Sequence, residues 1–220
     1  MYLIEGNVGV GKSTLLALIH EHLKHVHVVF EKVDSWDKNE QGASLLSHFY
    51  KDTPRWSYTM ETYTMFTRVK EHLHEQSQNN SFKVIERSLF SGHYCFAKNG
   101  YQQGYMDVIE WQLYTDWFNF LVNQHCKAPY GFIYLQADPL TCKERTEKRN
   151  RSSEAGIPLT YFEQIHEKHE AFLIKKQNVA PLIKDVPVLV LDATYDFQSD
   201  KETLTDYLDK INTFIQVTQR

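Results

Sequence analysis

The sequence of 220 residues lacks a surplus of positive charge, since 24 Lys and Arg stand against 28 Asp and Glu for a net charge of −4. A protein that coats nucleic acid normally carries a basic excess or a basic tail, so we expect no nucleic-acid partner. No apolar run approaches the roughly 20 residues of a membrane-spanning helix, so we expect no membrane partner either. Any anionic ligand must therefore be bound by a local group of cations.

Cysteine is scarce as well. Cys95, Cys126 and Cys142 are odd in number and widely separated, so they form neither a C-x-x-C metal knuckle nor a disulfide framework. The chain opens on a short strand-like run from Met1 to Gly6, without the basic region and long apolar stretch of a signal peptide. We therefore predict a reducing, cytoplasmic location.

Short apolar runs alternate along the chain with longer segments that have helical spacing. Residues 56–74, 107–125, 139–148 and 161–176 are predicted helices, and the apolar runs are predicted strands. Such alternation is typical of a parallel sheet with helices on both faces. We predict a single α/β domain over residues 1–220, with three layers and a five-stranded parallel sheet. The strands are expected at residues 2–4, 26–30, 84–85, 132–135 and 188–191.

A phosphate-binding loop follows the first predicted strand directly. The pattern G-x-x-x-x-G-K-[ST] is matched by Gly6, Asn7, Val8, Gly9, Val10, Gly11, Lys12, Ser13 and Thr14. The glycines let the backbone wrap a phosphate, while successive N–H groups and the N-terminus of the following helix supply positive potential. Lys12 is expected to reach the terminal phosphates of a nucleotide, and Ser13 to ligate Mg²⁺. The guanine-reading N-K-x-D motif is missing, and the chain has no room for the second domain of a motor.

Charged residues follow two of the predicted strands. Glu31 comes after the second strand, and Glu86 and Arg87 come after the third. Ligands of open α/β sheets bind at the carboxyl ends of the strands, so we expect both carboxylates near the phosphate-binding loop. One can accept the proton of an attacking hydroxyl group while the other holds Mg²⁺ through water. The alternative is that these residues are solvated at the edge of the sheet.

A local group of cations lies where the low overall charge requires one. Two of its members, Arg145 and Arg149, are four residues apart and share a helix face. Cations over the phosphoryl oxygens favour transfer, so we predict a helical lid over about residues 143–156. Acidic residues interleave with the group, and a solvated basic helix face is the alternative. The cations are Lys143, Arg145, Lys148, Arg149 and Arg151.

These motifs together resemble the deoxynucleoside kinase family, and within it the deoxycytidine and deoxyguanosine kinases. Besides the phosphate-binding loop, the resemblance rests on Glu31 followed by Trp36, on Glu86-Arg87-Ser88 and on residues 56–68, 135–139, 145–154, 156–161 and 166–170, so it covers nearly the whole chain. It implies a P-loop NTPase-type fold and ATP-dependent, Mg²⁺-assisted phosphorylation of a deoxynucleoside at its 5′-hydroxyl, in nucleotide salvage. A thymidylate-like nucleoside monophosphate kinase and a non-catalytic nucleotide-binding regulator are the alternatives.

The resemblance also implies catalytic roles. Glu31 would be the general base, although the family's Glu-Pro pair is here Glu31-Lys32. Arg87 would hold the 5′-oxygen and the phosphate, and Glu86 would support Mg²⁺. The lid arginines would be Arg145, Arg149 and Arg151.

Further roles concern the binding of the nucleoside and of the phosphate donor. By the resemblance, Tyr50 and Glu154 bind the 3′-hydroxyl of the sugar, and Trp36 lines the base pocket. The segment Tyr195, Asp196 and Phe197 would lie against the base of the donor. The family is usually dimeric through helices, which suits an aromatic helix around Trp111, Tyr114, Trp117 and Phe118.

Departures from the family pattern bear on the choice of nucleobase. Glu61 stands where the family usually has a Gln, and an ionised Glu accepts hydrogen bonds but donates none. Arg68, two helical turns further on, matches the base-site arginine, whose usual acidic partner is replaced by Gly92. We expect Gly92 to open space for a bulky base and predict a purine preference, with deoxyguanosine first and deoxycytidine or deoxyadenosine as alternatives. A simple Glu61–Arg68 salt bridge is the competing explanation.

Overall fold

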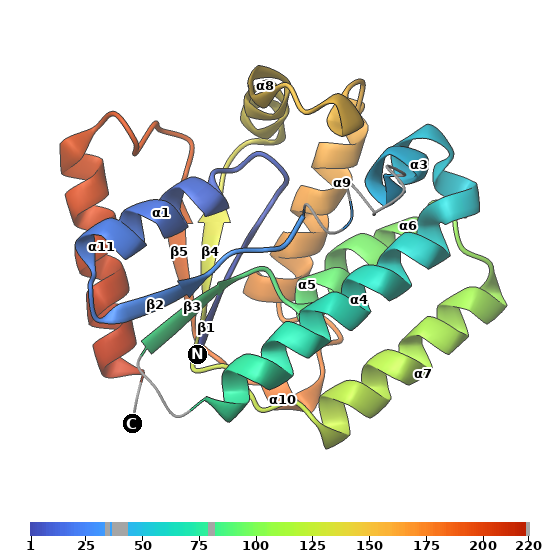
Figure 1. The fold of residues 1–220 in the computed structure, drawn as a ribbon, viewed down its shortest axis with the longest axis horizontal. Coiled ribbons are helices and arrows are strands. Elements are labelled where there is room, and N and C mark those ends of the chain that lie inside the picture. The colour runs from blue at the N-terminus through green and yellow to red at the C-terminus, as the bar shows by residue number, and fades with distance from the viewer. Residues whose placement is uncertain (34–35, 37–43, 79–81, 219–220) are drawn as a thin grey trace.

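The computed structural model describes residues 1–33, 36, 44–78 and 82–218. Its centre is a sheet of five strands in the order β2-β3-β1-β4-β5, and every pair of neighbours is parallel (Figure 1). The predicted five-stranded parallel sheet is therefore confirmed. The strands are β1 (Tyr2–Gly6), β2 (Val26–Val29), β3 (Phe82–Glu86), β4 (Gly131–Gln136) and β5 (Val188–Asp192).

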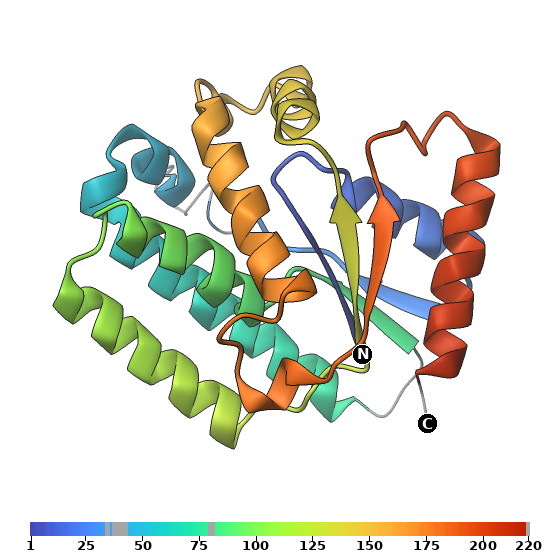
Figure 2. The same ribbon diagram turned by 180° about the vertical axis from the view of Figure 1, so that it is seen from behind.

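Helices cover both faces of the sheet, because its central strands are apolar on both sides. In β1, Tyr2 and Ile4 pack into one core with α1 (Lys12–His22) and α11 (Lys201–Val217), whereas Leu3 packs into the other. That second core lies under α4 (Thr53–Ser77) and α7 (Val108–Gln124), as Figures 1 and 2 show from opposite sides, whereas Phe162 of α9 (Leu159–His169) packs into the first core. The result is the predicted three-layer arrangement.

Local signals fix where the long helices begin. Asp52 caps α4, Asp107 and Glu110 form a capping box on α7, and Asp138 caps α8 (Pro139–Arg149). The helix predicted over residues 161–176 is an α-helix only as far as His169 and continues as the π-helical turn η3 (Glu170–Ile174). The shorter elements are α3 (Leu45–Lys51), α5 (Leu89–Ser91), the π-helical η1 (Gly92–Ala97), α6 (Lys98–Gln102), the 3-10 turn η2 (Ser152–Glu154) and α10 (Pro181–Lys184).

The aromatic residues of α7 do not share one face. Tyr114 and Phe118 are buried in the core under α4, so their assignment to a dimer surface is wrong. Trp117 is 55% exposed and lies on the outer face of the helix. None of the described helices is both long enough and apolar enough to cross a membrane.

A buried ion pair joins the end of α4 to β3. Lys83 Nζ lies 2.9 Å from Glu75 Oε2 and donates to the Glu75 carbonyl at 2.7 Å. Because both side chains are buried, Lys83→Met should lower the free energy of unfolding by about 3–5 kcal/mol through the uncompensated carboxylate. Urea unfolding of the variant and of the wild type measures this difference in the free energy of unfolding.

The matched control for Lys83→Met is Lys210→Met, which breaks the exposed pair between Lys210 and Asp206. Exposed pairs contribute about 0–1 kcal/mol, so this variant should unfold close to wild type. Equal losses in the two variants would contradict a special cost of burial at Lys83.

Candidate active site

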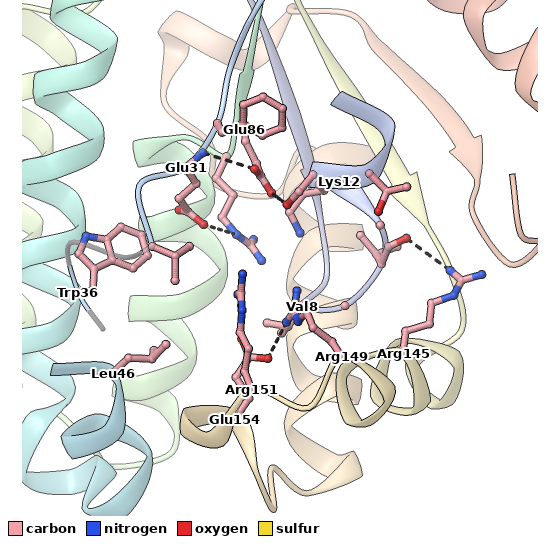
Figure 3. A pocket seen from close by; sticks show the side chains of 18 of the residues that line it. Val8, Lys12, Glu31, Trp36, Leu46, Glu86, Arg145, Arg149, Arg151 and Glu154 are labelled. Carbon is pink, nitrogen blue, oxygen red and sulfur yellow. Dashed lines mark hydrogen bonds and ion pairs between the residues drawn. The ribbon is translucent and has the colours of Figure 1, made fainter. Parts of the chain in front are cut away.

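A cavity of about 720 Å³ lies at the carboxyl ends of the strands. The phosphate-binding loop forms one wall, the residues after β2 and β3 form another, and α4 and the α8–η2 segment close the rest (Figure 3). Residues 8–14 of the loop line the cavity, whereas Gly6 and Asn7 lie beneath it. Asn7 Nδ2 donates to the carbonyl of Phe162 at 2.8 Å, which ties the loop to α9.

The loop depends on glycine where it passes α8. Gly9 has φ = 73°, and a Cβ atom there would lie 2.2 Å from Thr146 Oγ1 and 2.4 Å from the carbonyl oxygen of Cys142. The contact with Cys142 is to backbone, so neither neighbour can easily give way. The lid helix therefore packs directly on the phosphate-binding loop.

Lys12 is folded back on the loop that carries it. Its Nζ donates to the carbonyls of Asn7 at 2.7 Å and Gly6 at 3.1 Å, and the residue is 5% exposed. Burial lowers the pKa of Lys12 to about 7, and the positive charge of Arg87 acts in the same direction. An anion bound in the loop would relieve this cost, so the lysine is suited to a phosphate ligand.

Ser13 and Glu86 meet at the mouth of the loop. Ser13 Oγ donates to Glu86 Oε1 at 2.7 Å, and the backbone N–H of Glu31 approaches Glu86 Oε2 at 3.4 Å (Figure 3). A hydroxyl and a carboxylate are the oxygen ligands that Mg²⁺ takes when phosphates complete its shell. Among the described residues no group of three or more His, Cys, Asp or Glu side chains could hold a metal without such help.

The carboxylate of Glu31 lies between two arginines. Arg68 Nε and Nη2 donate to Glu31 Oε1 at 2.9 and 2.7 Å, and Arg87 Nε lies 3.3 Å from Glu31 Oε2. Burial alone would lower the pKa of Arg68, but the charge of Glu31 raises it overall. Among the described residues no ion pair joins Arg68 to Glu61, so the Glu61–Arg68 salt bridge considered as the competing explanation is not formed.

Gly92 lies behind Arg68 rather than on the cavity wall. A Cβ atom at Gly92 would come within 2.9 Å of Arg68 Nη1, so the guanidinium fills the space that the missing side chain leaves. Our expectation that Gly92 opens room for a bulky base is therefore wrong. The glycine instead lets Arg68 lie where it reaches Glu31.

Two side chains of the predicted base pocket, Trp36 and Glu61, line the same cavity as Arg68. Trp36 is buried, and the Arg68 guanidinium lies 5.5 Å from the centroid of its ring. Glu61 is 6% exposed and lines the cavity from α4. Burial raises the pKa of Glu61 to about 7, although the nearby charges of Arg68 and Arg87 lower it.

The three arginines of the predicted lid contact two different parts of the protein. Arg149 Nη2 and Arg151 Nη1 donate to the carboxylate of Glu154 at 2.6 and 3.4 Å, and all three residues line the cavity (Figure 3). Arg145 lies on the far side of the cavity from Trp36, and its guanidinium donates to the carbonyls of Ala193, Thr194 and Tyr195. Arg145 thus ties α8 to the segment that follows β5.

The other predicted binding residues are only partly brought together. Tyr50 and Glu154 both line the cavity, where burial, followed by the charge of Glu154, raises the pKa of Tyr50. Asp196 and Phe197 line its other end, and Phe197 packs against Gly11. Tyr195 is 67% exposed and does not line the cavity, unlike the two residues that follow it.

The family model described as Deoxynucleoside kinase matches residues 2–216 of the chain. The chain belongs to the deoxynucleoside kinase family. Deoxycytidine kinase 2 of Gallus gallus is 35% identical, over 96% of this chain and 89% of the relative. The mitochondrial deoxyguanosine kinase of Xenopus laevis is 32% identical, over 96% of this chain and 88% of the relative. The mitochondrial thymidine kinase 2 of Homo sapiens is 33% identical, over 96% of this chain and 77% of the relative.

Membership of the deoxynucleoside kinase family settles the class of the protein. The relatives are enzymes that phosphorylate nucleosides, so the phosphate-binding loop here belongs to an enzyme rather than to a non-catalytic regulator. The relatives are named for three different nucleosides. The match therefore leaves the nucleobase open.

Glu5 and several residues of the cavity were given no role in this deoxynucleoside kinase from sequence. Glu5 is a charged residue inside a strand that is buried on both faces, which is the signal that could have drawn attention to it. It accepts a hydrogen bond from Ser88, and burial raises its pKa. The others come from separate elements that only folding unites, and they are Leu46, Phe49, Met60, Tyr161 and Gln198.

Proposed function

We propose that this enzyme transfers the terminal phosphate of ATP to the 5′-hydroxyl of a deoxynucleoside in nucleotide salvage. The observation that carries the proposal is the position of Glu31, whose carboxylate lies in the same cavity as Lys12 and the phosphate-binding loop. A carboxylate beside the terminal phosphate suits an alcohol acceptor, whose proton must leave as the O–P bond forms.

The phosphate donor is bound in this proposal by the loop and the lid. The N–H groups of residues 9–14 and Lys12 hold the terminal phosphates, and Asp196 and Phe197 lie toward the donor's base. Ser13 and Glu86 are the residues that would hold Mg²⁺. When bound, the ion supplies positive charge to the phosphate oxygens. Arg149 and Arg151 are close enough to the cavity to leave Glu154 and meet a phosphate.

Glu31 must change partners for the reaction to proceed. In the structure Arg68 and Arg87 both contact its carboxylate. We propose that the nucleoside draws Arg68 toward its base, which frees Glu31 Oε1 to accept the 5′-hydroxyl proton. Arg87 then stays beside the reacting oxygen, where a guanidinium offsets charge on the transferring group.

We propose guanine as the preferred base. Guanine presents two adjacent donors, N1–H and the 2-amino group, and a carboxylate at Glu61 offers only acceptors. Arg68 is a good partner for the O6 and N7 acceptors of the same base. The substrate would therefore be deoxyguanosine first, with deoxyadenosine and deoxycytidine behind it.

The direct test is phosphate transfer from labelled ATP to a panel of nucleosides and deoxynucleosides, with the monophosphates offered in parallel. We expect 5′-monophosphates from the deoxynucleosides and the highest kcat/KM with deoxyguanosine. Transfer only to monophosphates would favour a thymidylate-like kinase instead. Turnover of thymidine equal to that of deoxyguanosine would contradict the guanine argument alone.

We further propose that the enzyme is a homodimer through α4 and α7, which lie side by side (Figure 1). Apolar side chains at helical spacing are exposed on α7, and two more aromatic residues are exposed on α4. Exposed apolar surface of this kind marks interaction sites. The residues are Ile109, Leu113, Trp117 and Phe120 on α7 with Tyr63 and Phe66 on α4.

Trp117→Glu should convert the proposed dimer to a monomer, because it places a charge in the middle of the apolar stripe. Sedimentation equilibrium at micromolar concentration measures the mass. Val217→Glu on α11, in the opposite layer, replaces an equally exposed apolar residue and should leave the mass unchanged. A wild-type chain that sediments as a monomer would refute the dimer.

The cytoplasmic location stays a prediction. All three cysteines are unpaired and buried, as expected of a chain from a reducing compartment. Two of the relatives are named as mitochondrial, so the family itself does not decide between these compartments.

A further inference from the structure

Glu61 is a buried carboxyl group whose partners are not provided by the protein. It is 6% exposed, and among the residues that the structure describes none donates a hydrogen bond to its carboxyl oxygens. It lines both the main cavity and an adjoining cavity of about 160 Å³. A buried acid without a partner is costly, so a ligand in the cavity is the group that can satisfy it.

The charges around Glu61 nearly cancel. Arg68 and Arg87 face it as cations, but both are engaged by the anionic Glu31. The other titratable groups near it are phenols, which are neutral at ordinary pH. They are Tyr50 from α3, Tyr114 from α7 and Tyr161 from α9.

Burial therefore decides the titration of Glu61. It raises the pKa of this carboxyl to about 7, and the two arginines oppose the shift without abolishing it. The acid and the carboxylate are thus both populated near neutral pH, whereas an exposed Glu would be almost fully ionised there.

The two forms present different hydrogen-bonding groups to a base. The carboxylate offers only acceptors, which match the paired donors of guanine. The neutral acid offers one O–H donor beside one acceptor, as a Gln amide does. That pair matches the ring nitrogen and the amino group of adenine or cytosine. Each wrong combination leaves a buried acceptor facing an acceptor or a donor facing a donor.

We propose that Glu61 is a protonation-dependent specificity residue: its carboxylate selects guanine, its neutral acid admits adenine and cytosine, and the base preference of the enzyme therefore changes with pH. The inference rests on the proposed deoxynucleoside kinase reaction and deepens it. As pH rises, the carboxylate fraction grows and the acid fraction falls. The preference for deoxyguanosine must then increase with pH and cannot decrease.

A competition assay tests this directly. Deoxyguanosine and deoxyadenosine are offered together with ATP and Mg²⁺ between about pH 6 and pH 8, and the two monophosphates are quantified. Their ratio reports the ratio of the kcat/KM values, so any titration of the general base or of the donor site cancels. For a carboxyl that titrates near pH 7, the ratio should rise about tenfold to a hundredfold across this range. When deoxycytidine replaces deoxyadenosine, the ratio of the two monophosphates should also rise with pH.

Glu61→Gln is the decisive comparison, because the amide keeps one donor and one acceptor at every pH. In this variant the ratio should be flat and should favour deoxyadenosine. Glu71→Gln changes the same residue type on α4, at a side chain that pairs with Lys32, and should keep the wild-type slope. A flat ratio in the wild type, or an equal slope in Glu61→Gln, would overturn the inference.

Infrared spectroscopy provides a second measurement that does not depend on turnover. The difference spectrum between wild type and Glu61→Gln should contain a protonated-carboxyl band that disappears as pH rises through about 7. Absence of that band at pH 6 would overturn the inference even if the variant were inactive. Failure of every deoxynucleoside to accept phosphate would instead overturn the proposed function.

Discussion

Glu31→Gln is expected to lower kcat by about 10²-fold or more while nucleoside binding changes little. The loss is that of a general base, because the amide cannot take the 5′-hydroxyl proton. Binding should survive because Arg68, which donates two hydrogen bonds to Glu31 Oε1 in the structure, leaves residue 31 for the base when the nucleoside binds, and a neutral amide does not oppose that move. Single-turnover rates and nucleoside affinity, measured by fluorescence titration, separate the two effects.

The control for Glu31→Gln is again Glu71→Gln, which should keep kcat within about twofold because surface substitutions rarely matter. Thermal unfolding is needed in parallel, since removing the charge of Glu31 leaves Arg68 and Arg87 less compensated. Unchanged turnover in a folded Glu31→Gln variant would remove Glu31 from the role of base.

Lys12→Met is expected to lower kcat/KM for ATP by about 10²- to 10³-fold, the usual cost of one charged donor to a developing oxyanion. The fold should survive, because Met has similar length and suits a side chain that is 5% exposed. Burial already lowers the pKa of Lys12 to about 7, so the native state bears a desolvation cost that Met removes. The melting temperature should therefore stay equal or rise while activity is lost.

Lys143→Met provides the control for Lys12→Met. Lys143 is also a cation of the predicted lid, on α8, but it does not line the cavity and its ammonium pairs with Glu147 at the surface. Steady-state kinetics with ATP as the varied substrate should give a kcat/KM close to wild type for this variant. Lys12→Met with more than a tenth of wild-type activity, or with a much lower melting temperature, would contradict the assigned role.

Much of the fold was predictable because its signals are local. The five apolar runs became the five strands, since strands buried on both faces need continuous apolar sequence. Asp52, Asp107 and Asp138 cap the long helices as acidic N-caps do. The π-helical turns were not predicted, because a π-turn adds one residue to a periodicity that reads as ordinary helix.

The pairing of charges was less predictable. Spacing along α4 suggested Glu61 as the partner of Arg68, yet the arginine lies on Glu31, 37 residues away in the chain. Gly92, from a third element, makes that contact possible by leaving room for the guanidinium. Helical spacing shows which residues share a face but not which distant side chain packs on that face.

The sequence by itself determined the phosphate-binding loop, the parallel sheet and the carboxylates at the strand ends, because each follows from residues adjacent in the chain. Only the tertiary structure decided that Arg68 and Arg87 hold Glu31 and that Arg145 ties the lid to the segment after β5. Only the folded chain shows that Glu61 is buried and that none of the described residues donates a hydrogen bond to its carboxyl oxygens. A side chain becomes buried, and meets charges from distant parts of the chain, only when separate elements pack together. Burial and those charges then decide the pKa and the hydrogen-bond partners of residues that the sequence already names.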